Sequence, residues 1–180
     1  AEKISIVTGG GSGIGRATCE RFAKEGSSVV VAEINEAAGQ ETVDLITDAG
    51  GISIFLPLDV TDINSVKAMV EHTVNRYGTI DILVNNAGIG KAGNVVTTSI
   101  DDWDSIIKVN LTGTYLVTKH SMEHLIKSQN SSIVNIASVA GVVAVKDRFA
   151  YSTSKGGVIS LTKSIALDFV NNLTAPLDAL

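Results

Sequence analysis

Two kinds of segment alternate along the chain. Short apolar, β-branched runs are followed by longer stretches in which apolar residues recur every three to four positions. The first pattern is typical of buried strands and the second of amphipathic helices, and their regular alternation indicates βα units and a parallel sheet. The expected strands are 4–7, 27–32, 52–58, 80–84 and 133–137, and the expected helices are 13–24, 36–49, 62–77, 102–127 and 151–170. Thr61 is the expected N-cap of helix 62–77.

Five strands that alternate with helices predict a doubly wound parallel sheet of Rossmann type, an α/β fold in three layers, α/β/α. No repeat, low-complexity tract or linker divides the sequence, so we expect residues 1–180 to form a single domain. Ligands of such sheets bind outside the carboxyl ends of the strands. We therefore expect the ligand-binding and catalytic residues to follow directly after the strands.

Composition narrows the possible classes of protein. The chain is 44% hydrophobic and 18% charged, which excludes a disordered or collagen-like chain. Its longest apolar runs are far shorter than the roughly 20 residues needed to cross a bilayer. Ala1-Glu2-Lys3 leads directly into a predicted strand, so we expect no secretory signal, no membrane association and a cytoplasmic protein.

The net charge and the cysteine and histidine residues argue against two further classes, nucleic-acid-binding proteins and metalloproteins. The net charge is −5 and the basic residues are scattered, which argues against a nucleic-acid partner. Cys19 is the single cysteine and is expected to be a buried small hydrophobe. His120 and His124 have helical spacing but lack an acidic third ligand, so no metal site is expected.

The first predicted strand ends in a glycine-rich turn, Thr-Gly-Gly-Gly-Ser-Gly-Ile-Gly at 8–15, inside which a helix begins. Glycines allow a tight turn, remove side chains that would block a pyrophosphate, and let the helix pack closely on the strand. Backbone N–H groups at the helix N-terminus then face the anion. An ordinary tight turn is the alternative interpretation.

Glu33 ends the second predicted strand, 18 residues after Gly15. This is near the spacing at which an acid meets the adenosine ribose of a dinucleotide. A carboxylate there accepts hydrogen bonds from the ribose hydroxyls and repels a 2′-phosphate, so we expect NAD rather than NADP. Arg16 is the nearby base that argues for the phosphorylated cofactor, although it can equally cap or solvate the first helical turn.

A second group of candidate residues follows the fifth strand. Tyr151 and Lys155 are four residues apart at the start of a helix and therefore share one face. An ammonium beside a phenol favours the phenolate, which suits a general base. Ser138 lies 13 residues before Tyr151, at the strand exit, where its hydroxyl can reach the same substrate oxygen.

Taken together, these motifs resemble the short-chain dehydrogenase/reductase family in its roughly 250-residue form. The resemblance runs from Lys3 to about Asn172. It rests on the glycine turn 8–15, Asp59-Val60, Asn85-Asn86-Ala87-Gly88, Asn110, Ser138 and Tyr151-Ser152-Thr153-Ser154-Lys155.

The resemblance implies a cofactor-binding set. Asp59 and Val60 would line the adenine pocket, and Asn85 would brace the sheet. Lys155 would also bind the cofactor's ribose, beside Tyr151. The turn residues that would hold the pyrophosphate are Gly9, Gly11, Ser12, Gly13, Ile14 and Gly15, and the residues that would pass along the adenosine ribose are Asn86, Ala87 and Gly88.

The resemblance also implies a catalytic set of Asn110, Ser138, Tyr151 and Lys155. Tyr151 would be the acid/base, Ser138 would polarise the substrate oxygen, and Lys155 would tune Tyr151. Asn110 is similar to the family asparagine that anchors a water in a proton relay; from the residues alone it would be a buried polar group satisfied by local backbone.

The implied activity is hydride transfer between NAD and an alcohol or ketone, in a homodimer or homotetramer. An NADPH-dependent 3-ketoacyl-type reductase is the alternative within the family. After Asn172 the expected sixth strand and the substrate-covering segment have no counterpart. A non-catalytic dinucleotide-binding fragment is therefore the alternative from another class, and an intact mass near 18.7 kDa would favour it.

Overall fold

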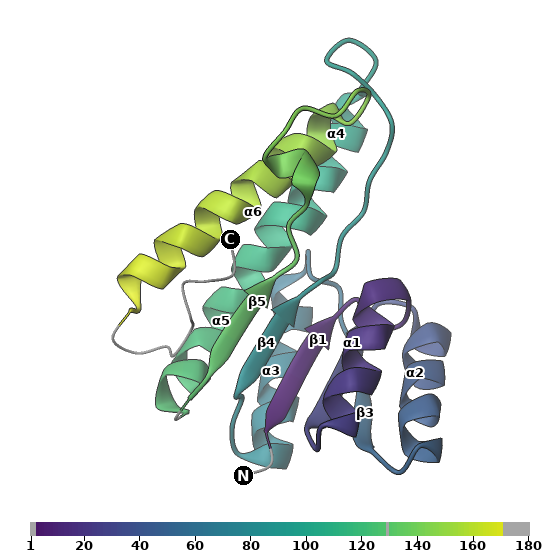
Figure 1. Cartoon of the computed structure of the whole chain (residues 1–180), viewed down its shortest axis with the longest axis vertical. Helices are drawn as coiled ribbons and strands as arrows, with labels where there is room; N and C mark the ends of the chain where they lie inside the picture. The colour runs from purple at the N-terminus through teal and green to yellow at the C-terminus, as the bar shows by residue number, and fades with distance from the viewer. Residues whose placement is uncertain (1–2, 129, 171–180) are drawn as a thin grey trace.

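The computed structural model describes residues 3–128 and 130–170, and their elements alternate as the hydrophobic pattern predicts (Figure 1). The strands are β1 (Ile4–Thr8), β2 (Ser28–Glu33), β3 (Ile52–Pro57), β4 (Ile82–Asn85) and β5 (Ser132–Asn135). The α-helices are α1 (Gly13–Lys24), α2 (Glu36–Asp48), α3 (Ile63–Tyr77), α4 (Ile100–Ile107), α5 (Thr114–Lys127) and α6 (Phe149–Asp168). In the described ranges, no helix combines the length and the apolar character that crossing a bilayer requires.

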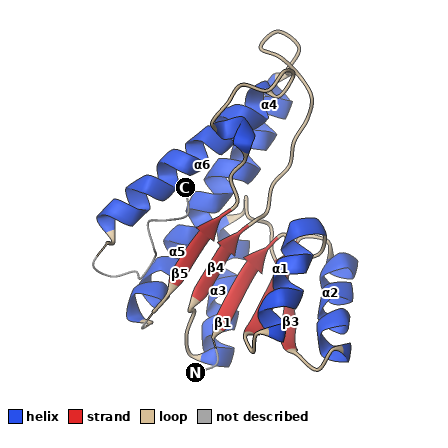
Figure 2. Cartoon of the chain, viewed as in Figure 1, coloured by secondary structure: helices blue, strands red, loops and turns tan. Residues whose placement is uncertain are grey.

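The five strands form one parallel sheet in the order β3-β2-β1-β4-β5 (Figure 2). The chain runs outward from β1 to β3 and then returns to place β4 on the other side of β1. The direction of winding therefore reverses between β1 and β4, where Val7 is in register with Val84. This order confirms the predicted doubly wound fold, and it brings the carboxyl ends of β1 and β4 side by side.

Helices cover both faces of the sheet, which gives the predicted α/β/α layers. Alternate residues of β2 show the arrangement, because Val29 and Val31 pack with Cys19 of α1 and Ile46 of α2. The intervening side chains face a second core built with α3 and α5; it includes Val30, Ala32, Val66, Met69, Val117 and Leu125. Burial on both faces explains why the central strands β1 and β2 are nearly continuous apolar runs.

Two local expectations were wrong. The N-cap of α3 is Asp62, whose carboxylate accepts a hydrogen bond from the Asn64 N–H at 2.9 Å, whereas Thr61 donates to Asp59. The expected helix 102–127 is interrupted by a π-helical turn, η1 (Lys108–Gly113), between α4 and α5. An inserted residue in a single turn barely changes the hydrophobic spacing, so the pattern did not reveal it.

Candidate functional site

A cleft of about 460 Å³ opens at the carboxyl end of the sheet, across the point where the strand order reverses. Its wall comes from the segments that follow β1, β2, β3 and β4, together with η1. The lining residues are Gly9, Ser12, Gly13, Ile14, Glu33, Ile34, Leu58, Asp59, Val60, Asn86, Ala87, Gly88, Ile89 and Val109. Most of the predicted cofactor-binding residues thus share one cleft, and of the six turn residues predicted to hold the pyrophosphate only Gly11 and Gly15 lie outside its lining.

The glycine turn packs so closely that side chains are excluded. A Cβ atom added at Gly15 would lie 2.0 Å from the Gly9 carbonyl oxygen and 2.6 Å from Asn86 Nδ2. Gly9 has a φ of +65° and Gly13 a φ of +50°, which are left-handed conformations that other residues rarely adopt. These glycines let α1 begin directly against the end of β1.

The N-terminus of α1 faces the cleft without a side-chain cap. Its N-cap residue, Ser12, accepts no hydrogen bond with its side chain, whereas Asn35 caps α2 and Ser99 caps α4. The first N–H groups of a helix lack partners within the helix and carry its positive dipole end. Because Ser12, Gly13 and Ile14 line the cleft, this end of α1 can receive an anion such as a phosphate.

Thr8 joins the ends of β1 and β4, a role that the sequence analysis missed. Its hydroxyl accepts hydrogen bonds from the N–H groups of Asn86 and Ala87, both at 3.0 Å. In return, Asn86 Nδ2 donates to the carbonyls of Thr8 and Gly9 at 3.0 and 3.1 Å. The signal available in the sequence was a buried threonine directly before the glycine turn. Its bonds align the two strand exits that border the cleft.

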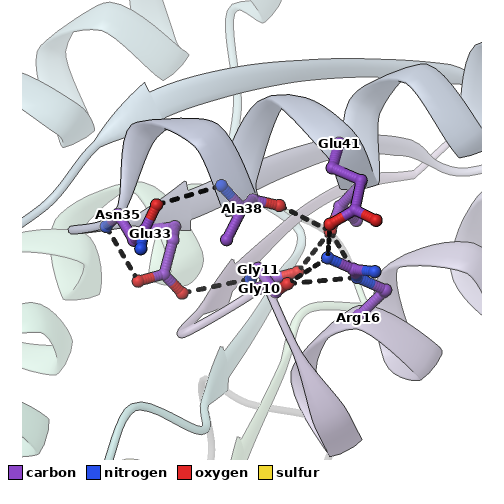
Figure 3. Close-up of polar contacts among 8 residues, drawn as sticks. Gly10, Gly11, Arg16, Glu33, Asn35, Ala38 and Glu41 are labelled. Carbon is purple, nitrogen blue, oxygen red and sulfur yellow. Dashed lines mark hydrogen bonds and ion pairs between the residues drawn. The ribbon is translucent and has the colours of Figure 1, made fainter.

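Glu33 ends β2 at the rim of the cleft, where backbone N–H groups hold its carboxylate (Figure 3). Oε2 accepts from Gly11 N–H at 3.1 Å, and Oε1 accepts from Ile34 and Asn35 N–H at 2.9 and 3.0 Å. The carboxylate therefore joins the glycine turn to the start of α2. Its negative charge is fixed where the sequence analysis expected an acid.

Arg16 contacts the same turn and makes an ion pair with Glu41 of α2. Its guanidinium donates to the Gly11 carbonyl at 2.6 and 3.1 Å, and its Nη2 lies 2.5 Å from Glu41 Oε2. The hydrogen bond with Glu41 raises the pKa of Arg16 above its usual value. The arginine thus binds the turn and α2, a role more specific than solvating the first helical turn.

Asp59 and Val60 line the cleft after β3. Asp59 Oδ1 accepts hydrogen bonds from the N–H and the hydroxyl of Thr61, both at 2.8 Å. Val60 is buried, and a Cβ atom at Gly113 of η1 would lie 2.7 Å from its Cγ2. The glycine in η1 therefore lets this helix approach the wall of the cleft.

Asn85 ends β4 next to the cleft and joins the sheet to α5. Its Nδ2 donates to Thr118 Oγ1 at 2.9 Å and to Asn135 Oδ1 at 2.8 Å. Asn135, at the end of β5, donates in turn to Thr162 of α6 at 2.9 Å. This partly buried chain of polar groups braces the ends of β4 and β5 against both helices, as the resemblance implied for Asn85.

Lys155 is the buried cation of the predicted catalytic set, with only 4% of its surface exposed. Its Nζ donates to the carbonyl of Ile136, just after β5, at 2.5 Å, and lies 5.8 Å from the centre of the Tyr151 ring. Burial lowers the pKa of the Lys155 ammonium from its usual value near 10.5. Tyr151 and Lys155 thus lie together on one face of α6, as their spacing predicts.

Ser138 is held close to α6 by the turn that it starts. Its Oγ accepts from Ala140 N–H at 3.2 Å and caps the short 3-10 helix η2 (Val139–Gly141). A Cβ atom at Gly141 would lie only 2.6 Å from the carbonyl carbon of Lys155. Backbone contact at Gly141 therefore fixes the distance between the Ser138 turn and the Lys155 segment.

Asn110 lies inside the π-helical turn and is 1% exposed. Its Oδ1 accepts from Ile89 N–H at 2.8 Å, and its Nδ2 donates to the Ile89 carbonyl at 2.9 Å and to Ser154 Oγ at 3.0 Å. These partners come from the segment after β4 and from α6, so the side chain is not satisfied by its own local backbone. It links the wall of the cleft to the helix that carries Tyr151.

The predicted catalytic residues do not line the cleft, and Gly88, which does, lies between the cleft and two of them. A Cβ atom at Gly88 would lie 3.3 Å from Asn110 Oδ1 and 3.6 Å from Lys155 Nζ. The structure also adds four apolar lining residues that carried no polar or glycine signal in the sequence: Ile34, Leu58, Ile89 and Val109. Among the described residues, no group of three or more His, Cys, Asp or Glu side chains can hold a metal ion.

These features define an α/β protein with a doubly wound sheet, a glycine turn at the winding reversal and a buried lysine near Gly88 of the cleft. The family model of short chain dehydrogenases matches residues 3–173. The chain belongs to the short chain dehydrogenase family.

Relatives and solved structures are similar over most of this chain. An uncharacterized oxidoreductase of Thermotoga maritima is 42% identical over 165 residues, which cover 92% of this chain and 64% of that protein. A 3-oxoacyl-(acyl-carrier-protein) reductase of the same organism is 41% identical, with 91% and 67% covered. A short chain dehydrogenase/reductase from Burkholderia phymatum, solved in complex with NAD, superposes with a TM-score of 0.92 at 33% identity and covers 94% of this chain and 61% of that one. The chain thus spans about two thirds of the length of the relatives it matches.

Proposed function

We propose that the protein is an oxidoreductase that transfers a hydride between NAD and an alcohol or carbonyl substrate. The observation that carries this proposal is the continuity of the site at Gly88. There, the cleft that begins at the glycine turn and Glu33 meets Lys155 and Asn110. An elongated ligand bound at the turn would reach the catalytic candidates at its other end. The NAD complex of the Burkholderia phymatum relative supports this choice of cofactor.

The residues present fit a dinucleotide. The uncapped N-terminus of α1 suits the pyrophosphate, and the Glu33 carboxylate at the rim suits the ribose hydroxyls. Asp59 and Val60 would border the adenine, and Asn86, Ala87 and Gly88 would follow the adenosine ribose. When bound, the nicotinamide supplies or accepts the hydride.

The chain's own residues would control the proton and the charge on the substrate oxygen. Tyr151 Oη gives the proton to that oxygen during reduction and takes it during oxidation. Ser138 Oγ donates a second hydrogen bond to the same oxygen, where charge develops in the transition state. The ammonium of Lys155, 5.8 Å from the Tyr151 ring, favours the phenolate. Asn110 has a positioning role, because its side chain binds the segment at Ile89 to α6.

The decisive experiment is an assay of a panel of alcohols, sugars and hydroxy acids with NAD, in parallel with direct measurement of NAD binding. Tyr151→Phe should abolish turnover and leave NAD binding measurable, and Tyr115→Phe, at an exposed position of α5, is the matched control. Turnover of wild-type magnitude in Tyr151→Phe would refute the assignment. Binding without turnover of any substrate by the wild type would instead identify a dinucleotide-binding module, the competing function.

Cofactor preference distinguishes the proposed NAD-dependent enzyme from the second candidate, an NADPH-dependent 3-ketoacyl-type reductase. The 41% identity to a 3-oxoacyl-(acyl-carrier-protein) reductase favours it, whereas Glu33 favours NAD. Glu33→Ala should weaken NAD binding and admit NADP. An unchanged ratio of the two affinities would refute the role of Glu33. Association into a homodimer or homotetramer and a cytoplasmic location remain parts of the proposal; light scattering of the purified protein tests the first.

A further inference from the structure

Two opposite charges hold the Gly10–Gly11 turn from its two sides (Figure 3). On one side, the Glu33 carboxylate accepts the Gly11 N–H at 3.1 Å. On the other side, the Arg16 guanidinium donates to the Gly11 carbonyl at 2.6 and 3.1 Å. The single residue Gly11, through its N–H on one side and its carbonyl on the other, thus separates the acid at the rim of the cleft from a cation behind the turn.

Helix α2 neutralises that cation and fixes its position. Glu41 Oε2 lies 2.5 Å from Arg16 Nη2, and Arg16 Nε also donates to Thr42 Oγ1 at 3.1 Å. The Thr42 hydroxyl is fully buried and lies 3.0 Å from the Gly10 carbonyl oxygen, to which it can donate. The Arg16 side chain is 24% exposed, so its charge is screened less by solvent than that of a free surface arginine.

We propose that Glu41 is a second specificity residue, which excludes a dinucleotide phosphorylated on its adenosine ribose by neutralising Arg16 beside the turn. The inference rests on the proposed function. A ribose phosphate carries about two negative charges and would sit close to Glu33. Arg16 contacts Gly11 on the side opposite Glu33 and is the cation held at the turn, and Glu41 cancels its attraction for that phosphate. Glu33 repels the phosphate directly, and Glu41 removes the charge that would offset this repulsion.

Helix α1, which carries Arg16, also offers a matched control. Arg21, in the last turn of α1, and Glu25, which directly follows the helix, form an ion pair of 2.8 Å with side chains 70% and 62% exposed. The exposed fraction of Glu41 is likewise 62%. Removing either acid therefore deletes an equally exposed carboxylate from one ion pair, but only Glu41 acts on a cation that contacts the turn.

The test measures NAD and NADP binding to the purified protein by calorimetry at low salt. Glu41→Gln should raise the affinity for NADP relative to NAD by about fivefold, the upper range for releasing a partly exposed ion pair. Glu41→Lys should shift the ratio further in the same direction, and Glu25→Gln should leave it unchanged. The shift should shrink in about 1 M salt, which a purely structural effect would not do. In an Arg16→Gln background, Glu41→Gln should have no further effect on the ratio.

Two results would overturn the inference while the proposed function stands: a wild-type ratio in both Glu41 variants, or a shift that persists in the Arg16→Gln background. Wild-type protein that binds neither cofactor would overturn the proposed function, and the inference with it. Amide exchange in the ligand-free protein adds a readout without cofactor. Because Glu41 holds Arg16 on the turn, Glu41→Gln should speed exchange at Gly11, and Glu25→Gln should not.

Discussion

Replacing Asn110 with alanine removes one side chain that joins three parts of the site. Asn110 binds both backbone groups of Ile89, in the segment after β4, and the hydroxyl of Ser154 on α6. Its own position, in the π-helical turn, places it between the two. The substitution should therefore lower global stability and loosen α6 next to Lys155.

The magnitude follows from the lost hydrogen bonds. Three bonds of about 1 kcal/mol each give about 3 kcal/mol. Ser154 Oγ keeps a bond to the Tyr151 carbonyl, whereas the N–H and C=O of Ile89 lose their partner in Asn110. Water can reach Ile89, which is 40% exposed, and this places the expected loss at about 2–4 kcal/mol. For a chain of this size, that corresponds to a fall in Tm of about 4–16 °C.

Urea unfolding, followed by circular dichroism, measures the change for Asn110→Ala. Asn64→Ala, at an exposed position near the start of α3, is the control and should alter stability by less than about 0.5 kcal/mol. If Asn110→Ala differs from the wild type by no more than the control does, the three bonds do not hold the π-helical turn to α6, and the reasoning fails.

Three further predictions concern the turn, the buried lysine and the cysteine. Gly15→Ala should abolish NAD binding measured by calorimetry, because the added Cβ would lie 2.0 Å from the Gly9 carbonyl oxygen; wild-type affinity would contradict this packing. Burial lowers the pKa of Lys155, so the unfolded chain binds more protons below pH 10.5 and stability should rise with pH in the alkaline range. The rise should be smaller in Lys155→Met, and equal pH dependence of urea unfolding in both proteins would refute it. Burial raises the pKa of the Cys19 thiol to about 12, so a disulfide reagent at pH 8 should label it in urea but not in the folded protein; rapid labelling of the folded protein would contradict this.

Sequence periodicity was sufficient for the central strands β1, β2 and β4 because nearly all of their residues are buried. Val29 to Ala32 are all fully buried, and no exposed position interrupts the apolar signal of β2. The π-helical turn escaped detection because its cause lies elsewhere in the chain: Asn110 binds Ile89, and Gly113 lies against Val60. Neither contact leaves a trace in the local spacing of α4 and α5.

The glycine turn and Glu33 could be located from the sequence because strand exits mark their positions. The partners of Arg16 could not be found in the same way. Glu41 is one of several acids on α2, and only the packing of α1 against α2 places it 2.5 Å from the guanidinium. Thr8 was similarly hidden, because its partners, Asn86 and Ala87, are brought to it by the parallel pairing of β1 with β4.

The strand order also sets a direction for the proposed ligand. Glu33 follows β2 and Lys155 binds the backbone just after β5, with β1 and β4 between them. Three strand spacings of about 4.8 Å separate these exits by roughly 14 Å. An acid at one end and a buried cation at the other give the site opposite polarity across that distance. A dinucleotide bound in reverse would place its reacting end at Glu33, away from both Tyr151 and Ser138, so the positions of these charges would fix which end of the proposed ligand reaches a substrate.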